Sequence, residues 1–439
     1  MTAEMIATSR TARQPLLVRT VEIDDPGALL DLVPRHEALG WVRRGDGLVG
    51  WGRAVQIRTS GRDRFAAAER GWHELLQHAV VRDEVGLPGT GPVAFGAFAF
   101  ADDGEGVLIV PRVVVGRRGA TSWLTTIEPA ARIGPAAQIG PAATLAAVLD
   151  APEPVLAPGA VSFTDGALSA AGWTDVVAQG VEAIRAGEVD KVVLARDLIA
   201  TTERKVDPRW VLRRLAAAYE SCWTFSVDGI LGATPELLIR TDKGLVTSRV
   251  LAGTIRRTGD DDADLARAAT LAHSSKDLEE HEYAVASVAR SLEPFCSSTN
   301  VPDVPFVLHL PNVLHLASDV TGVLAGGPDH GAVPSSLALA AALHPTAAVC
   351  GTPTAAARAL ISRIEGMDRG RYAGPVGWIG ADGDGEWGIA LRSAELDRDD
   401  PHRLRLFAGC GIVAASNPAD ELAESEAKLE PIRSAIVTR

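Results

Sequence analysis

Hydrophobic and polar positions alternate in short runs along the first third of the chain. The runs LLVRTVEI, GPVAFGAFAF and GVLIVPRVVVG alternate or are rich in β-branched residues, and both properties are typical of strands. The run RFAAAERGWHELLQHAV instead repeats its apolar residues at helical spacing. Residues 15–130 are therefore predicted to form a strand-rich half that contains a helix.

An Ala/Pro-rich stretch follows over residues 129–159. It contains IGPAA twice, at Ile133 and Ile139, and resembles a connector or surface segment more than a packed element. The sequence therefore predicts a variable part at 1–158 that ends in this connector, and a second part at 159–439 that carries the chemistry. We expect the two parts to form one intertwined domain.

The same patterns divide the second part into strands and helices. Strands are predicted at Trp223–Ile239, at Gly244–Ile255, in NVLHLASDVTGVL, in the hairpin YAGPVGWIGADGDGEWGIALRSAEL and in RLRLFAG. Helices are predicted at Pro208–Glu220 and Lys276–Leu292, and a last helix begins with Asn417 as its cap and Pro418 at its first position. Strands joined by hairpins, with helices between the strand groups, predict an α+β fold with large antiparallel sheets.

The composition excludes several classes of protein. Of the 439 residues, 46% are hydrophobic and 23% are charged, and no apolar run approaches the length of a membrane-spanning helix. The N-terminal residues contain no apolar signal segment, so we expect a soluble cytoplasmic protein. Asp and Glu outnumber Lys and Arg by 56 to 43, which argues against a binder of nucleic acids or anionic membranes. An anionic ligand must therefore meet local positive charge.

The four cysteines lie far apart, at Cys222, Cys296, Cys350 and Cys410. No CxxC spacing occurs, which argues against a zinc site and against a disulfide framework. We expect all four to be reduced residues of the core.

Two predicted helices carry acids three residues apart. In the last helix, Glu421, Glu424 and Lys428 share one face. In the earlier helix, Asp277 and Glu280 share a face. Carboxylates from two helices can hold Mg²⁺, which takes one or two of them and leaves its other positions to water and substrate. The alternative is that the acids offset the macrodipole, pair with Lys428 or form a solvated face.

Lys191 and Glu236 are charged residues within apolar runs. Desolvation in DKVVLAR would favour the neutral amine of Lys191, as a general base requires. Burial in GATPELLIR would keep the carboxyl of Glu236 protonated, as a general acid requires. The structural alternatives are a lysine at a strand edge on the surface and an exposed glutamate.

Two glycine-rich stretches differ in how well they fit a binding loop. GTGPVA, from Gly89, fits GxGxxA, but a β-rich run follows where dinucleotide binding needs a helix. GCG at 409–411 is predicted to join a strand to the last helix, which would let its backbone N–H groups approach a ligand carboxylate. We retain only the second stretch as a candidate.

A series of segments in the second part has a specific order. From residue 191 to residue 428 the chain reads KVVLAR, TPELLIR, LAGTIRR, SSKDLEEHE, NVLHL, LHPTAAVCGTP, YAGPVGWI, ALRSAE and AGCGIVAASNPADELAESEAK. Together, over roughly residues 160–435, these segments resemble the chorismate-utilising enzyme family. The resemblance implies an α/β sandwich of two large antiparallel sheets flanked by helices, and a Mg²⁺-dependent reaction on chorismate.

The resemblance also implies roles for the matching positions. Mg²⁺ would be held by Glu280 and Glu424, with Asp277 and Glu421 behind or beside them, and would bind the ring carboxylate. The pyruvyl side chain and the carboxylates would be held by Arg392, Tyr372, the amides around Gly409 and Gly411, and Lys428. The ring would be lined by Gly253, Thr254 and His315.

One position bears on the reaction within the family. Ala252 stands where enzymes that make aminodeoxychorismate typically have a lysine nucleophile, so the implied nucleophile is water. Lys191 would activate this water for attack at C2 while Glu236 protonates the departing 4-hydroxyl, which is the isochorismate synthase pattern. A salicylate synthase, an anthranilate synthase component and a catalytically silent chorismate-binding paralogue are the alternatives.

Three positions depart from the family pattern. Asp277 stands where glutamate is common, Cys410 replaces a usual alanine and Ala347 replaces a usual proline. The first is expected to loosen a contact around the metal, and the others to alter loop rigidity. We expect a monomer that acts on chorismate without a glutaminase subunit. Whether the product serves menaquinone or catechol siderophore synthesis stays open.

Overall fold

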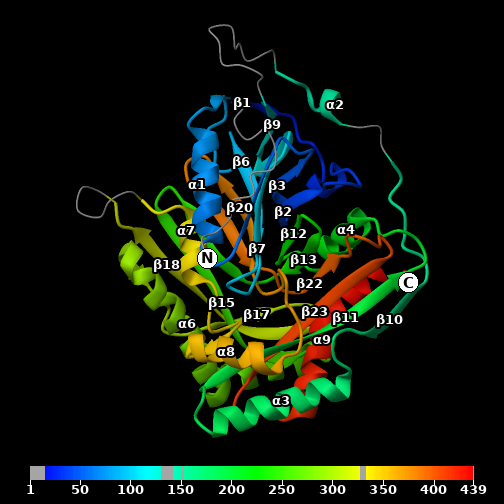
Figure 1. Cartoon of the computed structure of the whole chain (residues 1–439), viewed down its shortest axis with the longest axis vertical. Coiled ribbons are helices and arrows are strands. Elements are labelled where there is room, and N and C mark those ends of the chain that lie inside the picture. The colour runs from blue at the N-terminus through cyan, green and yellow to red at the C-terminus, as the bar shows by residue number, and fades with distance from the viewer. Residues whose placement is uncertain (1–14, 130–141, 150–152, 327–332, 439) are drawn as a thin grey trace.

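The computed structural model describes residues 15–129, 142–149, 153–326 and 333–438, and these residues form two large sheets (Figure 1). Sheet A has the strand order β10 (Val161–Asp165), β11 (Lys191–Thr202), β23 (Arg403–Ile412), β22 (Ser393–Leu396), β13 (Ile230–Thr234), β12 (Trp223–Val227), β2 (Leu39–Arg43), β3 (Asp46–Trp51), β8 (Val113–Arg118), β9 (Thr121–Pro129), β1 (Leu16–Ile23) and β5 (Val80–Asp83), with β19 (Gly351–Thr352) paired to β11. Sheet B has the order β16 (Cys296–Asn300), β18 (Val313–Leu324), β15 (Leu245–Arg256), β14 (Leu237–Asp242), β21 (Gly385–Ile389), β20 (Pro375–Gly380), β6 (Val93–Phe98), β7 (Glu105–Val110) and β4 (Val55–Ser60), with β17 (Phe306–His309) paired to β18.

The ladders between strands are antiparallel throughout the described residues, except for the parallel pair β1–β5. Both sheets combine strands from before and after residue 159. In sheet A, Val42 of β2 lies opposite Thr224 of β12, and in sheet B, Ala97 of β6 lies opposite Val376 of β20. The predicted α+β fold with two large antiparallel sheets is confirmed.

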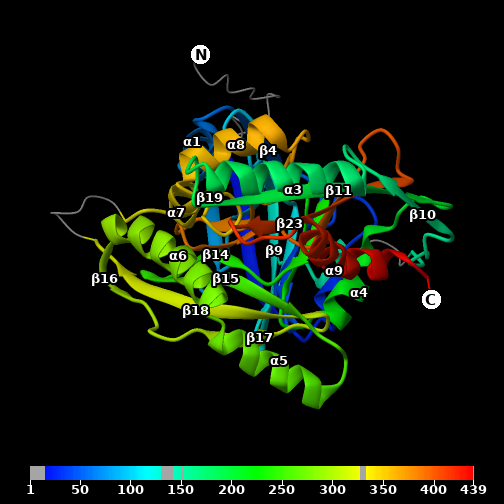
Figure 2. The same cartoon turned by 90° about the horizontal axis from the view of Figure 1, so that it is seen from below.

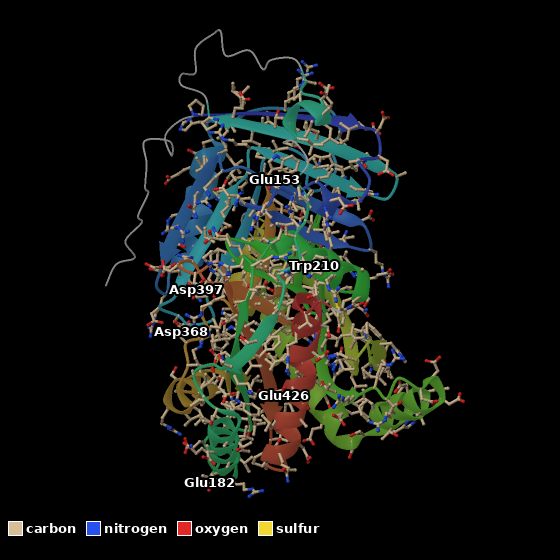
Figure 3. The ribbon with its side chains drawn as sticks, turned by 90° about the vertical axis from the view of Figure 1, so that its right-hand side faces the viewer. Glu153, Glu182, Trp210, Asp368, Asp397 and Glu426 are labelled. Atoms are coloured by element: carbon tan, nitrogen blue, oxygen red, sulfur yellow. The ribbon has the colours of Figure 1, made fainter. Side chains whose placement is uncertain are left out.

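Helices flank the sheets, at α1 (Arg64–Leu76), α2 (Leu145–Val148), α3 (Ala170–Arg185), α4 (Pro208–Ala218), α5 (Asp261–His273), α6 (Ser275–Leu292), α7 (Ser336–Leu343), α8 (Thr354–Ile364) and α9 (Pro418–Ile436), with the short 3₁₀ helices Leu29–Asp31 and Glu293–Phe295. Helix α6 packs on β15 and β18, as Figure 2 shows from below. Helix α9 packs against both α3 and α4, and Figure 3 labels Glu426 on α9, Glu182 on α3 and Trp210 on α4.

Side-chain caps hold the first turns of the two acidic helices, Asn417 as predicted and Ser274 one residue before the start of α6. The Asn417 side chain accepts hydrogen bonds from Ala419 N at 2.9 Å and Asp420 N at 3.4 Å, and Pro418 occupies the first position of α9. The Ser274 hydroxyl accepts from Asp277 N at 3.3 Å at the start of α6. Local capping chemistry therefore fixes which turn of each helix carries its acids.

One predicted boundary is wrong. Strand β23 extends to Ile412, so the GCG stretch at 409–411 lies inside the strand instead of in a turn. Its residues stand opposite Val193, Leu194 and Ala195 of β11, and this ladder holds the glycines in extended conformation. The turn to α9 comes later, where Ser416 N donates to Val413 O at 2.9 Å. The first IGPAA repeat and most of the second lie outside the described residues.

The chain crosses between the sheets at two corners. Residues 235–236 connect β13 of sheet A to β14 of sheet B, and residues 390–392 connect β21 of sheet B to β22 of sheet A. The corners adjoin, because Ile389 N donates to Glu236 O at 3.3 Å. Residues at both corners therefore lie where the two sheets meet.

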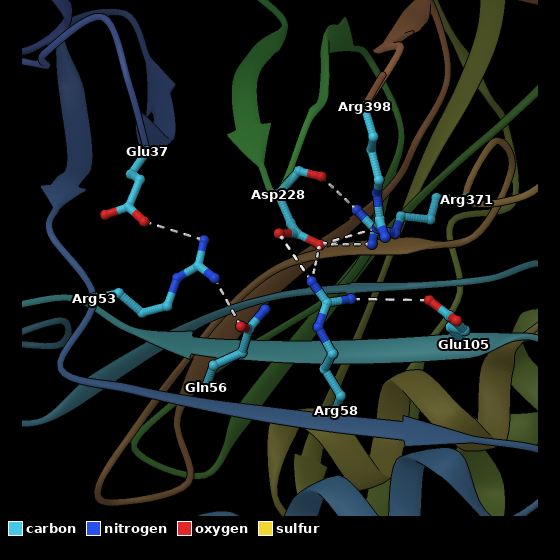
Figure 4. Close-up of polar contacts among 8 residues, drawn as sticks. All are labelled: Glu37, Arg53, Gln56, Arg58, Glu105, Asp228, Arg371 and Arg398. Carbon is cyan, nitrogen blue, oxygen red and sulfur yellow. Dashed lines mark hydrogen bonds and ion pairs between the residues drawn. The ribbon is translucent and has the colours of Figure 1, made fainter. Parts of the chain in front are cut away.

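The turn between β12 and β13 carries an ion cluster, shown in Figure 4. Asp228 accepts from Arg371 at 2.7 Å. It also pairs with Arg58 of β4 at 3.2 Å and with Arg398 of the β22–β23 connection at 3.4 Å. This one carboxylate therefore ties both sheets to the segment that precedes Tyr372.

The core contains three of the four cysteines, Cys222, Cys350 and Cys410, while Cys296 is half-buried. All four are free thiols, but the prediction that all four lie in the core is wrong for Cys296. Among the helices of the described residues, none combines the length and the apolar composition needed to span a membrane.

Candidate active site

A cavity of about 150 Å³ lies at the meeting point of the sheets. We call it the junction cavity. All fourteen residues singled out from the sequence line it, namely Lys191, Glu236, Gly253, Thr254, Asp277, Glu280, His315, Tyr372, Arg392, Gly409, Gly411, Glu421, Glu424 and Lys428. The structure thus brings together side chains that are more than 200 residues apart in sequence.

Four kinds of element supply all of these residues except Tyr372, which lies in the turn before β20. Lys191 begins β11, and its neighbour β23 carries the two glycines. Glu236 and Arg392 occupy the two corners between the sheets, and β15 and β18 of sheet B carry Thr254 and His315. Helices α6 and α9 present the acids. Sheets therefore form the walls, and two capped helices supply the carboxylates.

Lys191 makes a short ion pair inside the cavity. Its Nζ donates to Glu280 Oε1 at 2.7 Å, and the two side chains are 7% and 17% exposed. The strand-edge alternative on the surface does not apply, because Lys191 is buried. The amine of β11 and a carboxylate of α6 are therefore held together across the cavity.

Glu236 is a buried acid at the corner between β13 and β14. It is 5% exposed, and its carboxyl makes no hydrogen bond or ion pair within the described part of the chain. Burial raises the pKa of Glu236 to about 8, although Lys191, Arg392 and Lys428 act in the opposite direction. The carboxyl is therefore mostly protonated at neutral pH and able to donate a proton.

The proton of His315 is placed by its neighbours. A guanidinium only donates, so Nε2 of His315 accepts from Arg392 at 3.1 Å. Nδ1 then carries the proton and donates to Thr254 Oγ1 at 3.0 Å. Burial, with Arg392 and Lys428 nearby, holds the pKa of His315 well below its usual range. The ring is neutral and fixes the orientation of Arg392.

Arg392 also keeps one donor for a ligand. Its Nε is buried and has no hydrogen-bond partner among the described residues. The residue adopts a φ of 50°, and Ala373, which also lines the cavity, adopts a φ of 61°. Positive φ is uncommon for residues with side chains and occurs preferentially at functional sites. Arg392 is thus built to offer a guanidinium to an anion.

Lys428 links α9 to β23. Its Nζ pairs with Glu424 Oε1 at 2.6 Å and donates to Gly409 O at 2.9 Å. Burial is the largest single influence and opposes the charged amine, but the neighbouring groups, Glu424 first among them, together outweigh it and raise the pKa of Lys428. Lys428 therefore stays charged as a second cation for an anionic ligand.

The glycines of β23 make room for these polar groups. A Cβ at Gly411 would lie 2.9 Å from Glu280 Oε1 and 3.0 Å from Lys191 Cε. A Cβ at Gly409 would lie 3.1 Å from the hydroxyl of Tyr372. Close approach of side chains, and not a binding loop, explains why β23 carries glycine here.

The donor set fits a magnesium ion. Ligand atoms of Cys410, Glu421 and Glu424 lie within 4.8 Å of one another, and Glu280 faces the same cavity. Burial and the two glutamates keep the pKa of the Cys410 thiol well above its usual range, so it stays protonated and is a poor ligand. The remaining donors are carboxylate oxygens, which Mg²⁺ prefers. The Asp277 carboxylate, which also lines the cavity, accepts from the Ser274 hydroxyl.

Sequence reasoning missed a supporting layer behind β11. Arg369 lines the cavity and donates to Val193 O at 2.7 Å, while its pair partner Glu365 accepts from Ala195 N at 2.8 Å. Phe407 also lines the cavity and stacks on Tyr372 with ring centroids 5.1 Å apart. In the sequence, the signal that could have revealed this layer is the four-residue spacing of Glu365 and Arg369, just before Tyr372.

Comparison with known proteins assigns the chain to a family. Residues 8–437 match the family described as chorismate binding enzyme. The chain belongs to this family. It is 42% identical over 265 residues to an isochorismate synthase of Bacillus subtilis, an alignment that covers 57% of this chain and 64% of that protein.

Two further members of the chorismate-binding enzyme family match over most of the chain. The salicylate biosynthesis isochorismate synthase of Pseudomonas aeruginosa is 34% identical over 405 residues, which cover 88% of this chain and 82% of that protein. The solved menaquinone-specific isochorismate synthase of Escherichia coli has a TM-score of 0.77 at 24% identity, covering 97% of this chain and 95% of that chain. The resemblance drawn from the ordered segments is therefore confirmed, and so is the family fold.

Proposed function

We propose that this chain is an isochorismate synthase, which converts chorismate to isochorismate with Mg²⁺. The observation that carries the proposal is that a lysine amine and a protonated carboxyl, those of Lys191 and Glu236, line one cavity. The relatives in Bacillus subtilis and Pseudomonas aeruginosa are named isochorismate synthases, which supports it.

The reaction exchanges a hydroxyl between two ring carbons. Lys191 takes a proton from water as the water oxygen bonds to C2, the ring double bonds shift, and the C4–O bond breaks. Glu236 gives its proton to the departing hydroxyl, which leaves as water. Lys191 donates to Glu280 in the structure, so this contact must open and the ammonium must give up a proton before the amine can take one from water.

Charge complementarity supports a dianionic substrate. Arg392 and Lys428 supply two cations, and the free Nε–H of Arg392 suits the pyruvyl carboxylate. Tyr372 and the β23 backbone at Gly409 and Gly411 would complete the binding site of the pyruvyl side chain. Gly253, Thr254 and the neutral His315 line the place of the ring.

Glu280 and Glu424 would hold Mg²⁺, with Asp277 and Glu421 beside them. The ion would supply positive charge for the ring carboxylate among these acids, which otherwise repel it. In the structure the ammonium groups of Lys191 and Lys428 neutralise Glu280 and Glu424. Cation binding must therefore compete with two ion pairs.

The position of Ala252 supports water as the nucleophile. Ala252 lines the cavity and is 7% exposed, so no side-chain amine is available there. We propose a monomer that works in the cytoplasm without a glutaminase subunit, since the reaction consumes no ammonia. The relatives serve both salicylate and menaquinone formation by name, and we assign the product of this chain to neither route.

Product analysis tests the proposal. Purified protein is incubated with chorismate and Mg²⁺, and the products are separated by liquid chromatography. Isochorismate is expected, and EDTA should stop its formation until excess Mg²⁺ is restored. Accumulation of salicylate with pyruvate, or ammonia-dependent anthranilate, would identify another member of the family, and binding of chorismate without any product would identify a silent paralogue.

A further inference from the structure

A second cavity, of about 320 Å³, opens at the end of the sheets that carries the β2–β3 turn. We call it the tryptophan cavity, because four of the nine tryptophans of the chain line it, Trp41, Trp123, Trp223 and Trp378. None of its lining residues belongs to the junction cavity. The proposed reaction leaves this aromatic cluster unexplained.

Hydrogen bonds hold three of the four indoles in fixed orientations. Glu386 Oε2 accepts from Trp41 Nε1 at 2.8 Å and from Trp223 Nε1 at 3.2 Å. Trp123 Nε1 donates to Gly89 O at 3.2 Å. The Trp41 and Trp223 rings stack with centroids 6.2 Å apart. The walls are therefore rigid aromatic surfaces that lose little conformational entropy when a ligand binds.

The charge of the cavity is opposite to that of the whole protein. Five arginines line it, Arg43, Arg44, Arg117, Arg118 and Arg240, against the two acids Asp46 and Glu386, although the chain has a net charge of −13. Glu386 is already engaged by the two indoles and by Arg240 at 3.5 Å. The cavity therefore has an excess of guanidinium groups.

Two of these arginines lack an acidic partner. Arg43 and Arg44 form no ion pair within the described ranges of the chain. The Arg43 guanidinium lies 4.1 Å from the ring centroid of Trp223, and burial, with Arg249 and Arg44 nearby, lowers the pKa of Arg43 to about 10. Arg117 has a buried Nε without a hydrogen-bond partner there. An anion would relieve this local repulsion.

We propose that the tryptophan cavity binds a monocyclic aromatic carboxylate. The ring would stack on the indole and guanidinium planes, and the carboxylate would accept from Arg43 and Arg44. An aliphatic acid would satisfy the charge alone, whereas the four tryptophans favour a planar ring. The binding does not depend on the proposed reaction. The choice of salicylate as the probe does depend on it, because isochorismate gives salicylate when it loses pyruvate and its ring becomes aromatic.

Titration calorimetry of the whole, metal-free protein tests the site without turnover. Salicylate is expected to bind wild-type protein, and Arg43→Ala and Arg44→Ala should each weaken binding by about tenfold or more, the size of a charge-assisted hydrogen bond. Cyclohexanecarboxylate has the same charge without an aromatic face and should bind about fivefold more weakly. The matched control is Arg70→Ala, an exposed arginine of α1, which should bind as wild type does.

The junction cavity also offers cations, so a second variant separates the sites. Arg392→Ala should leave the affinity for salicylate unchanged. Loss of binding in Arg392→Ala with retention in both Arg43→Ala and Arg44→Ala would place the ligand in the junction cavity and overturn the proposal. Equal affinity for the aromatic and aliphatic acids, or no heat with wild type, would overturn it as well. Arg44 is exposed, so its variant remains informative if Arg43→Ala fails to fold.

Discussion

The junction cavity and the tryptophan cavity differ in how their charges are arranged. In the junction cavity, Lys191 and Lys428 are each paired with a glutamate, and Glu236 has a pKa of about 8. The charged lining of the tryptophan cavity is mostly guanidinium, with rigid indoles between the arginines. A carboxyl that exchanges its proton near neutral pH, as Glu236 does, suits chemistry, whereas guanidiniums keep their protons and suit binding.

The two cavities are nevertheless neighbours in the fold. A Cβ at Gly388 of β21 would lie 2.7 Å from the ring of Trp41 and 2.9 Å from Glu236 O. The same strand carries Glu386 near its start and leads to the corner that holds Arg392. Substitutions in each cavity can therefore show how independent the two sites are.

The largest expected effect comes from removing the proposed base. Lys191→Ala should lower turnover of chorismate by roughly 10²–10⁴-fold, the usual contribution of a general base. Salicylate affinity should not change, because the tryptophan cavity is intact. Steady-state isochorismate formation and calorimetry measure the two effects, with the exposed Lys205→Ala as the control. Near-normal turnover in Lys191→Ala would refute the assignment of the base.

The proposed acid predicts a pH dependence. A pKa of about 8 means that Glu236 loses its proton as the pH rises through 8, so kcat should fall on that alkaline side. Glu236→Gln should lower kcat by about 10²-fold, change the KM for chorismate much less, and lose this alkaline limb. Equal losses in rate and affinity would instead make Glu236 a binding group. A pH–rate profile of both proteins provides the measurement.

A single methyl group tests the packing of the junction cavity. Gly411→Ala places a Cβ against the Lys191–Glu280 pair and should lower turnover by about tenfold through misplacement of both groups. Gly172→Ala in α3 adds the same methyl with only ordinary contacts at 3.5 Å and beyond, and should retain full turnover. If both variants are equally active, the close approach at Gly411 does not control the positions of Lys191 and Glu280.

The smallest effect on activity is expected at the ion cluster outside both cavities. Asp228→Asn leaves the buried Arg371 without its carboxylate and should lower the free energy of unfolding by about 1–3 kcal/mol. Urea denaturation measures this loss, and Asp165→Asn, an exposed aspartate, is the control. Turnover per folded molecule should fall less than in Gly411→Ala. A larger loss of turnover would show that Arg371 positions the adjacent Tyr372.

Much of the junction cavity followed from the sequence because its parts are local patterns. Asn417 and Ser274 cap the two acidic helices, and the 3.6-residue period then places Glu421 and Glu424 on one face. The ordered segments supplied the rest through the family resemblance. The prediction that the GCG stretch forms a turn was wrong because glycine is equally compatible with a turn and with a crowded strand. Only the pairing with β11 decides between them.

The tryptophan cavity had no comparable signal. Its walls come from β2, β3, β8, β9, β12, β14, β20 and β21, and Trp41 and Glu386 are 345 residues apart. The ion pair of Lys191 with Glu280 and the burial of Glu236 at a corner between sheets are likewise products of long-range packing. By itself, the sequence determined the family, the strand and helix patterns and the acids on each helix face, because these depend on residues close together in the chain. Tertiary structure alone decided which charges are paired, which acid keeps its proton and where arginines gather on tryptophans, because burial and distance across two sheets set those energies.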